Sequence, residues 1–323
     1  MATITKKIDL KKMTSQQLQP IILTIVLVVM LLVFTIMNPN FITWTNLHTI
    51  LLSAVTVGII TIGQSVCKLA NYFDMSVGLV GAMGGLAAAF VLRDGSGSVP
   101  VAIMAGLAVG LVCGLLAGFL VSFMGMNAWV TTFALSSAYR GIVYIFTDGF
   151  PIALFTDNFL PFTKWGSLMV GGVIQFPIIV MVILFVLVQL FLSYRKLGRS
   201  IYLVGGNQYC AHICGINVRA VQMFIFILCD MLAAFAGMLF ASRMSSAAAF
   251  LSDTTTLESI AATVVAGIVA GRGNMFVSFI GVLIIYTLKN GLVMVGLPDF
   301  YQYLAIGLVI FLAVMVQREG KNN

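Results

Sequence analysis

The sequence predicts an all-α fold, a bundle of transmembrane helices that crosses a membrane many times. Three observations predict it: of 323 residues 61% are apolar, only 8% are charged, and the mean hydropathy is +1.10. A soluble domain has about 25% charged residues and about 45–50% apolar ones. This chain therefore cannot place a charged shell around one core, which excludes an ordinary soluble enzyme. An intrinsically disordered chain is excluded too, because disorder needs low hydrophobicity and high charge.

Ten apolar segments come close to the roughly 20 residues that a helix needs to cross a bilayer. They are residues 20–37, 47–68, 75–92, 100–124, 128–147, 168–193, 220–242, 257–271, 274–296 and 300–316. We therefore predict about ten spans in one membrane domain, residues 20–316. A basic tail, residues 1–19, precedes this domain, and a short tail, residues 317–323, follows it.

Basic residues gather on one side of this predicted topology. Eleven Lys and Arg fall on the side of the two termini, three fall on the opposite side, and three lie within or at the ends of spans, which accounts for all 17. Because Lys and Arg accumulate in cytoplasmic loops, we expect both termini to be cytoplasmic. The formal charge of +7 then reflects orientation in lipid, and no nucleic-acid partner is expected.

The fourth segment contains a row of glycines. Gly106, Gly110, Gly114 and Gly118 recur every four residues. Residues four apart share one face of a helix, and small residues allow membrane helices to approach closely. We predict that this face packs against another helix and performs no chemistry.

A short motif at residues 73–78, Phe-Asp-Met-Ser-Val-Gly, precedes a glycine-rich segment. Asp74 is expected to cap the N-terminus of a helix that begins at Met75. Short, interrupted helices of this kind often present backbone groups to solute in transporters. Asp74 and the preceding Asn71 are therefore candidates for the solute path, while a cap alone explains Asp74 equally well.

Five charged residues lie in or at the edges of apolar segments, namely Lys68, Arg140, Asp230, Glu258 and Lys289. An unpaired charge there costs about 2.5–3.5 kcal/mol on insertion scales, so such residues pair, face a wet cavity or snorkel. Asp230 is central in its segment and needs a partner or a proton. The sequence leaves open whether Lys68, Arg140, Asp230 and Lys289 face a solute path or pair with one another.

Hydroxyl side chains precede Arg140 in the fifth segment. Thr131, Thr132 and Tyr139 are candidates for binding a polyol, with Arg140 at the end of the strip. Hydrogen bonding between helices is the alternative explanation, and we favour it for Ser136 and Ser137.

The connection at residues 194–219 is long, basic and polar. A loop of this length among short turns is more often functional than idle. The chain has no phosphate-binding loop and no signature of a metalloprotease or serine hydrolase, so we expect neither enzyme activity nor a cofactor. Cys210, His212 and Cys214 lack a second ligand pair at zinc-finger spacing, which favours an ordinary loop over a metal site.

Five stretches together resemble the membrane-spanning permease subunit of bacterial ABC importers of the ribose and monosaccharide type. In chain order they are residues 40–47, 73–78, 198–207 with 215–218, 257–262 with 271–273, and 289–292. The similarity extends from Asn40 to Val316. It adds Lys289 and Asn290, in a Lys-Asn-Gly-Leu stretch, to the candidates for the solute path.

The resemblance implies a solute path that works by alternating access in a bacterial inner membrane. It implies a second permease subunit, identical or paralogous, an extracytoplasmic sugar-binding protein, and an ABC ATPase that binds ATP and Mg²⁺. By the same analogy, the 194–219 loop supplies a coupling helix that docks on the ATPase. The coupling candidates are Arg199, Gly205, Gly206, Asn207, Gly215 and Asn217.

Two departures from the family pattern leave room for other interpretations. Lys68 and Asp230 stand where this family usually has apolar or small residues, which would suit a charged sugar derivative if both face the path. They could instead pair with each other. The alternative function is an ion-coupled secondary transporter that works alone, with Asp230 and Glu258 as proton or sodium sites.

Overall fold

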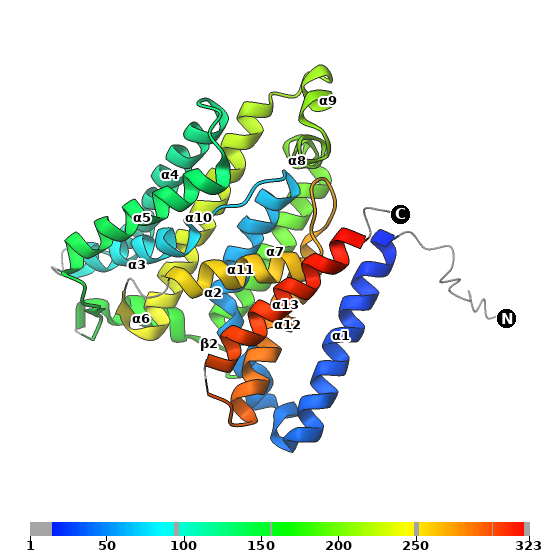
Figure 1. Ribbon diagram of the computed structural model, residues 1–323. Coiled ribbons are helices and arrows are strands. Elements are labelled where there is room, and N and C mark those ends of the chain that lie inside the picture. Colours follow the sequence, from blue (N-terminus) through cyan, green and yellow to red (C-terminus); the bar gives the residue numbers. More distant parts are fainter. Residues whose placement is uncertain (1–14, 94–96, 156, 249–251, 299, 320–323) are drawn as a thin grey trace, which may run out of the picture.

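The computed structural model describes residues 15–93, 97–155, 157–248, 252–298 and 300–319. The described chain is mainly helical, and the predicted all-α class is confirmed (Figure 1). The ten predicted segments correspond to α1 (Ser15–Met37), α2 (Trp44–Leu69), α3 (Val77–Arg93), α4 (Val99–Ser122), α5 (Ala128–Thr147), α7 (Phe176–Tyr194), α10 (Val218–Met244), α11 (Ser252–Val265), α12 (Met275–Met294) and α13 (Phe300–Glu319). Shorter elements are η2 (Pro39–Ile42), η3 (Asp157–Phe159), α6 (Leu160–Ser167), α8 (Lys196–Gly206) and α9 (Gln208–Ile213).

Six of the described helices are long and apolar enough to cross a membrane, namely α1, α2, α4, α7, α10 and α12. Helices α3 and α11 are shorter, with 17 and 14 residues. The number of ten crossings stays a prediction.

The segment predicted as a span from residue 168 starts instead as a hairpin. β2 (Met169–Val170) pairs antiparallel with β3 (Ile174–Gln175), and α7 begins only at Phe176. Gly171 and Gly172 have positive φ angles of 63° and 70°, which suit a tight turn and exclude a helix. A second small pair joins β1 (Ile152–Ala153) to β4 (Ser246–Ala247).

The helix predicted at residues 257–271 lies nearer the N-terminus than expected. α11 ends at Val265, and residues 266–274 form a loop that leads to α12. Gly267 and Gly271 adopt positive φ angles of 68° and 71°, so the backbone leaves the helix at this point.

Two irregular connections therefore flank the short helices α3 and α11. Residues 70–76 join α2 to α3, and residues 266–274 join α11 to α12. In Figure 1, α3 and α11 run from side to side while α1 and α2 run from top to bottom. The two short helices contact each other, and α11 also packs on α2. This confirms an interrupted helix at the predicted place after residue 70.

Helix α10 lies at the centre of the bundle, where it packs against α4, α3 and α2. The glycine row of α4 faces α10: a Cβ on Gly110 would lie 2.7 Å from the Asp230 carbonyl oxygen, and one on Gly114 would lie 2.6 Å from Ile227 Cα. Gly106 and Gly118 approach Met238 and Met223 in the same way. The prediction of a packing face is confirmed.

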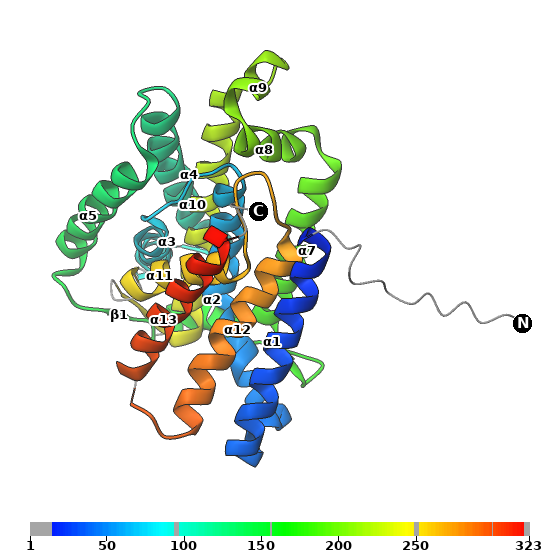
Figure 2. The same cartoon turned by 45° about the vertical axis from the view of Figure 1, so that its right-hand side comes forward.

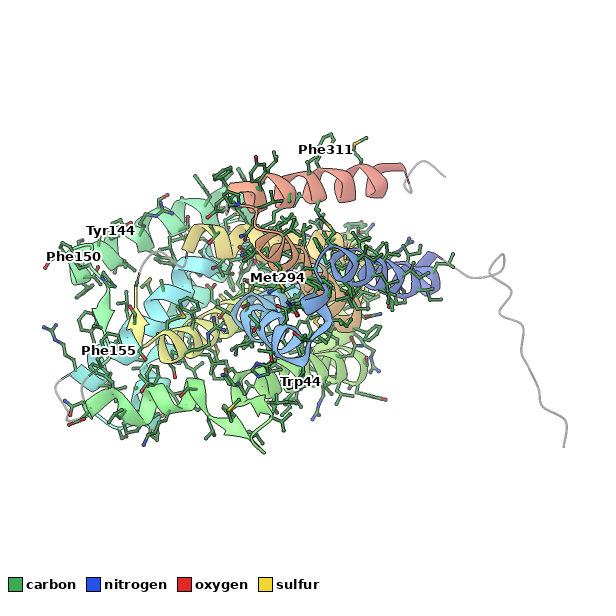
Figure 3. The ribbon with its side chains drawn as sticks, turned by 90° about the horizontal axis from the view of Figure 1, so that it is seen from below. Trp44, Tyr144, Phe150, Phe155, Met294 and Phe311 are labelled. Atoms are coloured by element: carbon green, nitrogen blue, oxygen red, sulfur yellow. The ribbon has the colours of Figure 1, made fainter. Side chains whose placement is uncertain are left out.

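Helices α8 and α9 protrude from one end of the bundle (Figures 1 and 2). The first turn of α1 and the last turns of α13 lie toward this same end. Around the bundle, large apolar side chains point outward, among them Trp44, Tyr144, Phe150 and Phe155 (Figure 3). An apolar outer surface of this extent suits contact with lipid tails.

A single methyl group at the α4–α10 contact is expected to destabilise the bundle. Gly114→Ala should lower the free energy of unfolding by about 1–3 kcal/mol, because the neighbouring Ile227 backbone cannot move aside without opening the helix pair. Gly141→Ala on α5 is the matched control, since a Cβ there meets nothing within 4 Å. Thermal unfolding of the detergent-purified chain measures both variants, and equal midpoints would contradict the close contact.

Candidate functional site

Polar side chains inside the bundle meet first at the turn between α2 and α3. The side chain of Gln64, on α2, forms two hydrogen bonds with the backbone of Asp74. Its Nε2 donates to the Asp74 carbonyl at 2.5 Å, and its Oε1 accepts from the Asp74 amide at 3.2 Å. The amide of Met75 donates to Thr132 Oγ1 on α5 at 2.9 Å. Side chains of two helices, α2 and α5, thus satisfy backbone groups that the broken helix leaves free.

The sequence predicted that Asp74 caps a helix that begins at Met75, and this prediction is wrong. Its Oδ1 accepts from the amide and the hydroxyl of Ser76, at 2.8 and 2.6 Å, and α3 begins only at Val77. Asp74 therefore shapes the turn that precedes the helix. The helix starts later because Gln64 and Thr132 bond to the backbone of residues 74 and 75 and hold them outside the helix.

Asp230, in the middle of α10, faces the same turn. Its side chain has no exposed surface, and its carboxyl group lies within hydrogen-bonding reach of the carboxyl group of Asp74. The Lys68 ammonium lies 4.2 Å from the centre of the Phe73 ring. The partner that the structure brings to Asp230 is Asp74, and not the Lys68 ammonium that the sequence suggested.

The predicted hydroxyl strip of α5 divides between several roles. Thr131, Thr132 and Tyr139 are buried, and Thr132 serves the α2–α3 turn. Ser136 and Ser137 both donate to the carbonyl of Phe133, so they bond to their own helix and not between helices as favoured above. A serine hydroxyl in a membrane helix commonly donates to a carbonyl of the preceding turn when no polar neighbour lies within reach.

A second polar group joins α11 to α12. Lys289 Nζ lies 2.6 Å from Glu258 Oε1, and the Tyr286 hydroxyl donates to Glu258 Oε2 at 2.8 Å. The structure thus pairs Lys289 with Glu258. Beside this pair lies a hollow of about 200 Å³, lined by Thr254, Glu258, Lys289, Gln302, Tyr303 and Ile306.

This hollow combines an ion pair with amide, hydroxyl and aromatic groups. It is smaller than the roughly 300–1,000 Å³ of sites for drug-sized ligands, so it matches a single small solute. Asn290, next in sequence to Lys289, is half-buried, and its Oδ1 has no hydrogen-bond partner among the described residues. Asn71 and Arg140 lie elsewhere: Asn71 is exposed in the α2–α3 turn with a φ of 70°, and Arg140 is half-exposed on α5.

The two short helices α8 and α9 contain the predicted coupling residues. Gly205 contacts the end of α2 so closely that a Cβ would overlap the Leu69 carbonyl oxygen. That same oxygen accepts from the Gly271 amide at 2.8 Å, so α8 rests on the end of α2 and on the 266–274 loop. Gly206 is exposed, and a Cβ there would meet nothing within 4 Å.

Other coupling candidates define the shape of this region. Asn207 caps α9 by accepting from the Cys210 amide, and Asn217 caps α10 by accepting from the Ala220 amide. Gly215 has a φ of 80°, which favours glycine at the turn between them. Arg199 is exposed on α8.

Tyr202, on α8, gives this region a second attachment to the 266–274 loop. Its hydroxyl donates to the Gly273 carbonyl at 3.0 Å. Burial raises the pKa of the Tyr202 phenol, which keeps its proton on the oxygen that donates.

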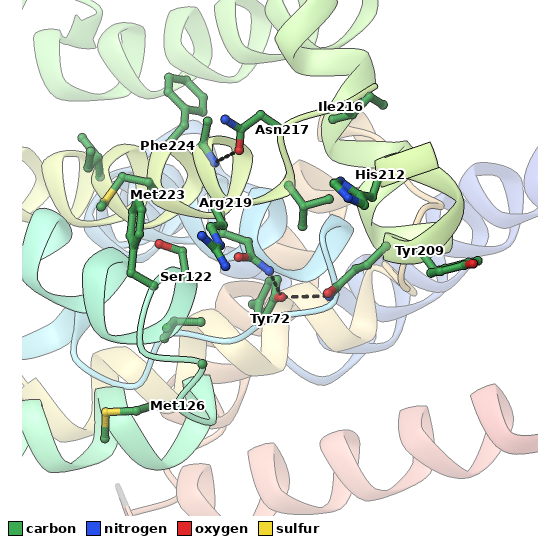
Figure 4. Close-up of a pocket in the computed structure, with 18 of the residues that line it drawn as sticks. Tyr72, Ser122, Met126, Tyr209, His212, Ile216, Asn217, Arg219, Met223 and Phe224 are labelled. Carbon is green, nitrogen blue, oxygen red and sulfur yellow. Dashed lines mark hydrogen bonds between the residues drawn. The ribbon is translucent and has the colours of Figure 1, made fainter. Parts of the chain in front are cut away.

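A wide groove of about 1,410 Å³ lies between α9, the start of α10 and the end of α4 (Figure 4). Tyr72, from the α2–α3 turn, reaches into it and accepts hydrogen bonds from the amides of Gln208 and Gln222, at 2.8 and 2.5 Å. Gln208 belongs to α9 and Gln222 to α10. The groove therefore joins the protruding helices to the turn that contains Asp74.

Sequence reasoning missed Gln64, Tyr72 and Tyr286 as site residues. Gln64 is a side-chain amide in an otherwise apolar stretch of α2, and such a residue in lipid signals a required hydrogen bond. Tyr72 and Tyr286 offered no comparable signal, because tyrosine is common at membrane edges. Among the described residues, no three His, Cys, Asp or Glu side chains lie close enough together to hold a metal ion.

Comparison with known proteins places this arrangement in a family. A family model described as "Branched-chain amino acid transport system / permease component" matches residues 46–314. The probable ABC transporter permease protein YphD of Escherichia coli K12 is 36% identical, covering 96% of this chain and 92% of the relative. The ribose import permease protein RbsC of Bacillus subtilis is 35% identical, covering 91% of each. The L-arabinose transport system permease protein AraH of Escherichia coli K12 is 30% identical, covering 91% and 89%.

The Glu258–Lys289 pair is expected to show energetic coupling. Glu258→Gln and Lys289→Met should each lower the thermal unfolding midpoint, because each leaves one charge without its partner in a mostly buried place. The double variant should lose less than the sum of the two, with a coupling energy of about 0.5–3 kcal/mol. Strict additivity in this double-mutant cycle would show that the pair does not act as a unit.

Proposed function

Since this chain belongs to the family of ABC importer permeases, we propose that it forms the membrane path for a monosaccharide or a related small polar solute. Relatives named for ribose and L-arabinose, at 30–35% identity over about nine-tenths of both chains, carry this proposal. The family model is described for branched-chain amino acids, but these named relatives favour a sugar. Permeases of this family hydrolyse no ATP themselves, so ATP and Mg²⁺ belong on a separate ATPase chain.

We propose that the hollow beside Lys289 and Asn290 contacts the solute. Glu258, Lys289 and Gln302 offer charged and amide groups to sugar hydroxyls, and Tyr303 offers an aromatic ring on the same rim. Five other candidates are buried within the bundle, where they would stabilise the helices around the path and not contact the solute: Thr131, Thr132, Tyr139, Asp74 and Asp230. Asn71 and Arg140 remain candidates for the path where it opens to either side.

Helices α8 and α9 have the features of a docking surface for an ATPase. Leu203, Tyr209 and Ile213 are exposed apolar residues on these protruding helices, beyond the ends of the long spans. Exposed aromatic and aliphatic groups of this kind anchor protein interfaces. We place the ATPase against this surface, with Arg199, Asn207, Gly215 and Asn217 in the same region.

Movement of this surface has a short route into the bundle. Gly205 lies against the Leu69 carbonyl and the Gly271 amide, so α8 touches the end of α2 and the 266–274 loop at once. Tyr72 links α9 and α10 to the α2–α3 turn by two hydrogen bonds. Displacement of α8 and α9 would therefore move the turn and the 266–274 loop together, as alternating access requires.

The proposed assembly contains a second permease subunit, identical or paralogous, and an extracytoplasmic sugar-binding protein. The protruding helices and both chain ends lie toward one end of the bundle. The excess of Lys and Arg in the corresponding loops supports a cytoplasmic location for that end, in a bacterial inner membrane.

Reconstitution tests the proposed function. Liposomes that contain the purified chain alone, under a proton or sodium gradient, should accumulate no labelled ribose or arabinose. Liposomes that also contain the cognate ATPase, with internal ATP and external binding protein, should accumulate one of them or a related solute. Gradient-driven uptake by the chain alone would support the ion-coupled alternative and contradict the proposal.

Two neighbouring glycines give a matched test of coupling. Gly205→Ala should lower ATP-driven uptake by roughly tenfold, because overpacking of about 1–3 kcal/mol separates α8 from Leu69. Gly206→Ala should leave uptake near the wild-type rate, since open space surrounds its position. Both variants should insert normally into the membrane, so that a difference in uptake reports on coupling and not on insertion. Equal uptake by the two variants would show that the contact of α8 with α2 does not transmit movement.

A further inference from the structure

The α2–α3 turn and α10 bring two fully buried carboxyl groups together, 156 positions apart in the chain. Asp74 and Asp230 each have 0% exposed surface. Their carboxyl groups lie within hydrogen-bonding reach of each other. The two aspartates line neither the hollow beside Lys289 nor the proposed docking surface on α8 and α9. The burial of two carboxyl groups side by side therefore needs a separate explanation.

Donors for the four carboxylate oxygens are distributed unequally. Asp74 Oδ1 accepts from the amide and the hydroxyl of Ser76. Asp74 Oδ2 and both oxygens of Asp230 have no donor among the described protein groups. As two carboxylates, the pair would place two negative charges side by side in a dry interior and leave three oxygens unsatisfied. Both conditions are strongly unfavourable.

The other titratable groups around the pair come from four helices. Cys67 lies on α2, Cys113 on α4, Tyr139 on α5 and Cys229 on α10 itself. None of the four is a basic side chain, so none supplies a positive charge that could neutralise a carboxylate. Tyr139, 4% exposed, lies beside the Cys113 thiol in the same buried region as the two carboxyl groups.

We propose that Asp230 is a neutral carboxylic acid whose O–H donates to Asp74 Oδ2, so that the pair binds one proton. The proton is taken up from water when the bundle forms and stays covalently bound to Asp230. This single proton removes one of the two charges and supplies the missing donor to Asp74. It also ties the middle of α10 to the α2–α3 turn.

The surroundings place the remaining negative charge on Asp74. Asp74 receives two hydrogen bonds from Ser76 and lies just before the N-terminus of the 17-residue helix α3. The positive end of a helix dipole favours an anion at that position. Asp230 has no donor among the described protein groups, and it lies in the middle of α10 and not at the end of its own helix.

Infrared spectroscopy tests the proton directly. The full chain, labelled with [4-¹³C]aspartate and reconstituted in liposomes at pH 7, should show a protonated-acid C=O band that shifts with the isotope. Asp230→Asn should abolish this band, while Asp74→Asn should keep it at a shifted frequency because the acceptor changes. Asp157→Asn, at an exposed position, is the control and should leave the band unchanged. Absence of the band in the wild-type chain, or its survival in Asp230→Asn, would overturn the proposal.

A stability comparison tests the tie between α10 and the turn. Asp230→Asn retains an N–H donor toward Asp74 Oδ2 and should unfold at nearly the wild-type temperature. Asp230→Leu has the same branching at Cγ but no donor, so its unfolding midpoint should fall. An Asp230→Leu chain as stable as wild type would contradict the tie. A chain that fails to fold leaves the infrared result on Asp230→Asn as the deciding measurement.

Discussion

The structure depends on satisfying backbone groups where membrane helices are interrupted. Lipid offers no hydrogen bonds, so every amide and carbonyl freed at a break must find a partner inside the protein. At the α2–α3 turn these partners are Gln64, Thr132 and the side chain of Asp74. Thr256 of α11 adds another by accepting from the Gly78 amide. The turn is therefore built jointly by α2, α5 and α11, and its position reports on all of them.

Close contacts between helix backbones connect the α2–α3 turn to the rest of the bundle. Glycines on α4 allow the backbone of α10 to approach, and Gly205 does the same for α8 and the end of α2. A contact between backbones transmits displacement with little loss, because no flexible side chain lies between them. Direct contacts therefore join α8 to the end of α2 and the 266–274 loop, and α4 to the central helix α10.

The predictions that succeeded depend on residues close together in the sequence, and those that failed depend mostly on contacts with distant segments. The glycine row of α4 was interpreted correctly because its four-residue spacing defines a helix face whatever the partner is. The start of α3 was predicted at Met75, two residues too early, because the decisive bonds come from Gln64 and Thr132. The span at residue 168 was predicted too long, because the turn at Gly171 and Gly172 looks apolar in composition. Lys289 was assigned a role without its partner Glu258.

The sequence by itself determined the membrane class, the helical segments and the family, because hydropathy, charge bias and short motifs are local properties. Only the tertiary structure decided which polar groups meet. Asp74 lies beside Asp230, and Lys289 lies beside Glu258. The residues that surround Asp74 or Lys289 in the sequence do not indicate which distant residue is the partner. In an apolar chain with few charges, the pairing of each is set by how the helices cross. Those crossings arise from packing over the whole bundle.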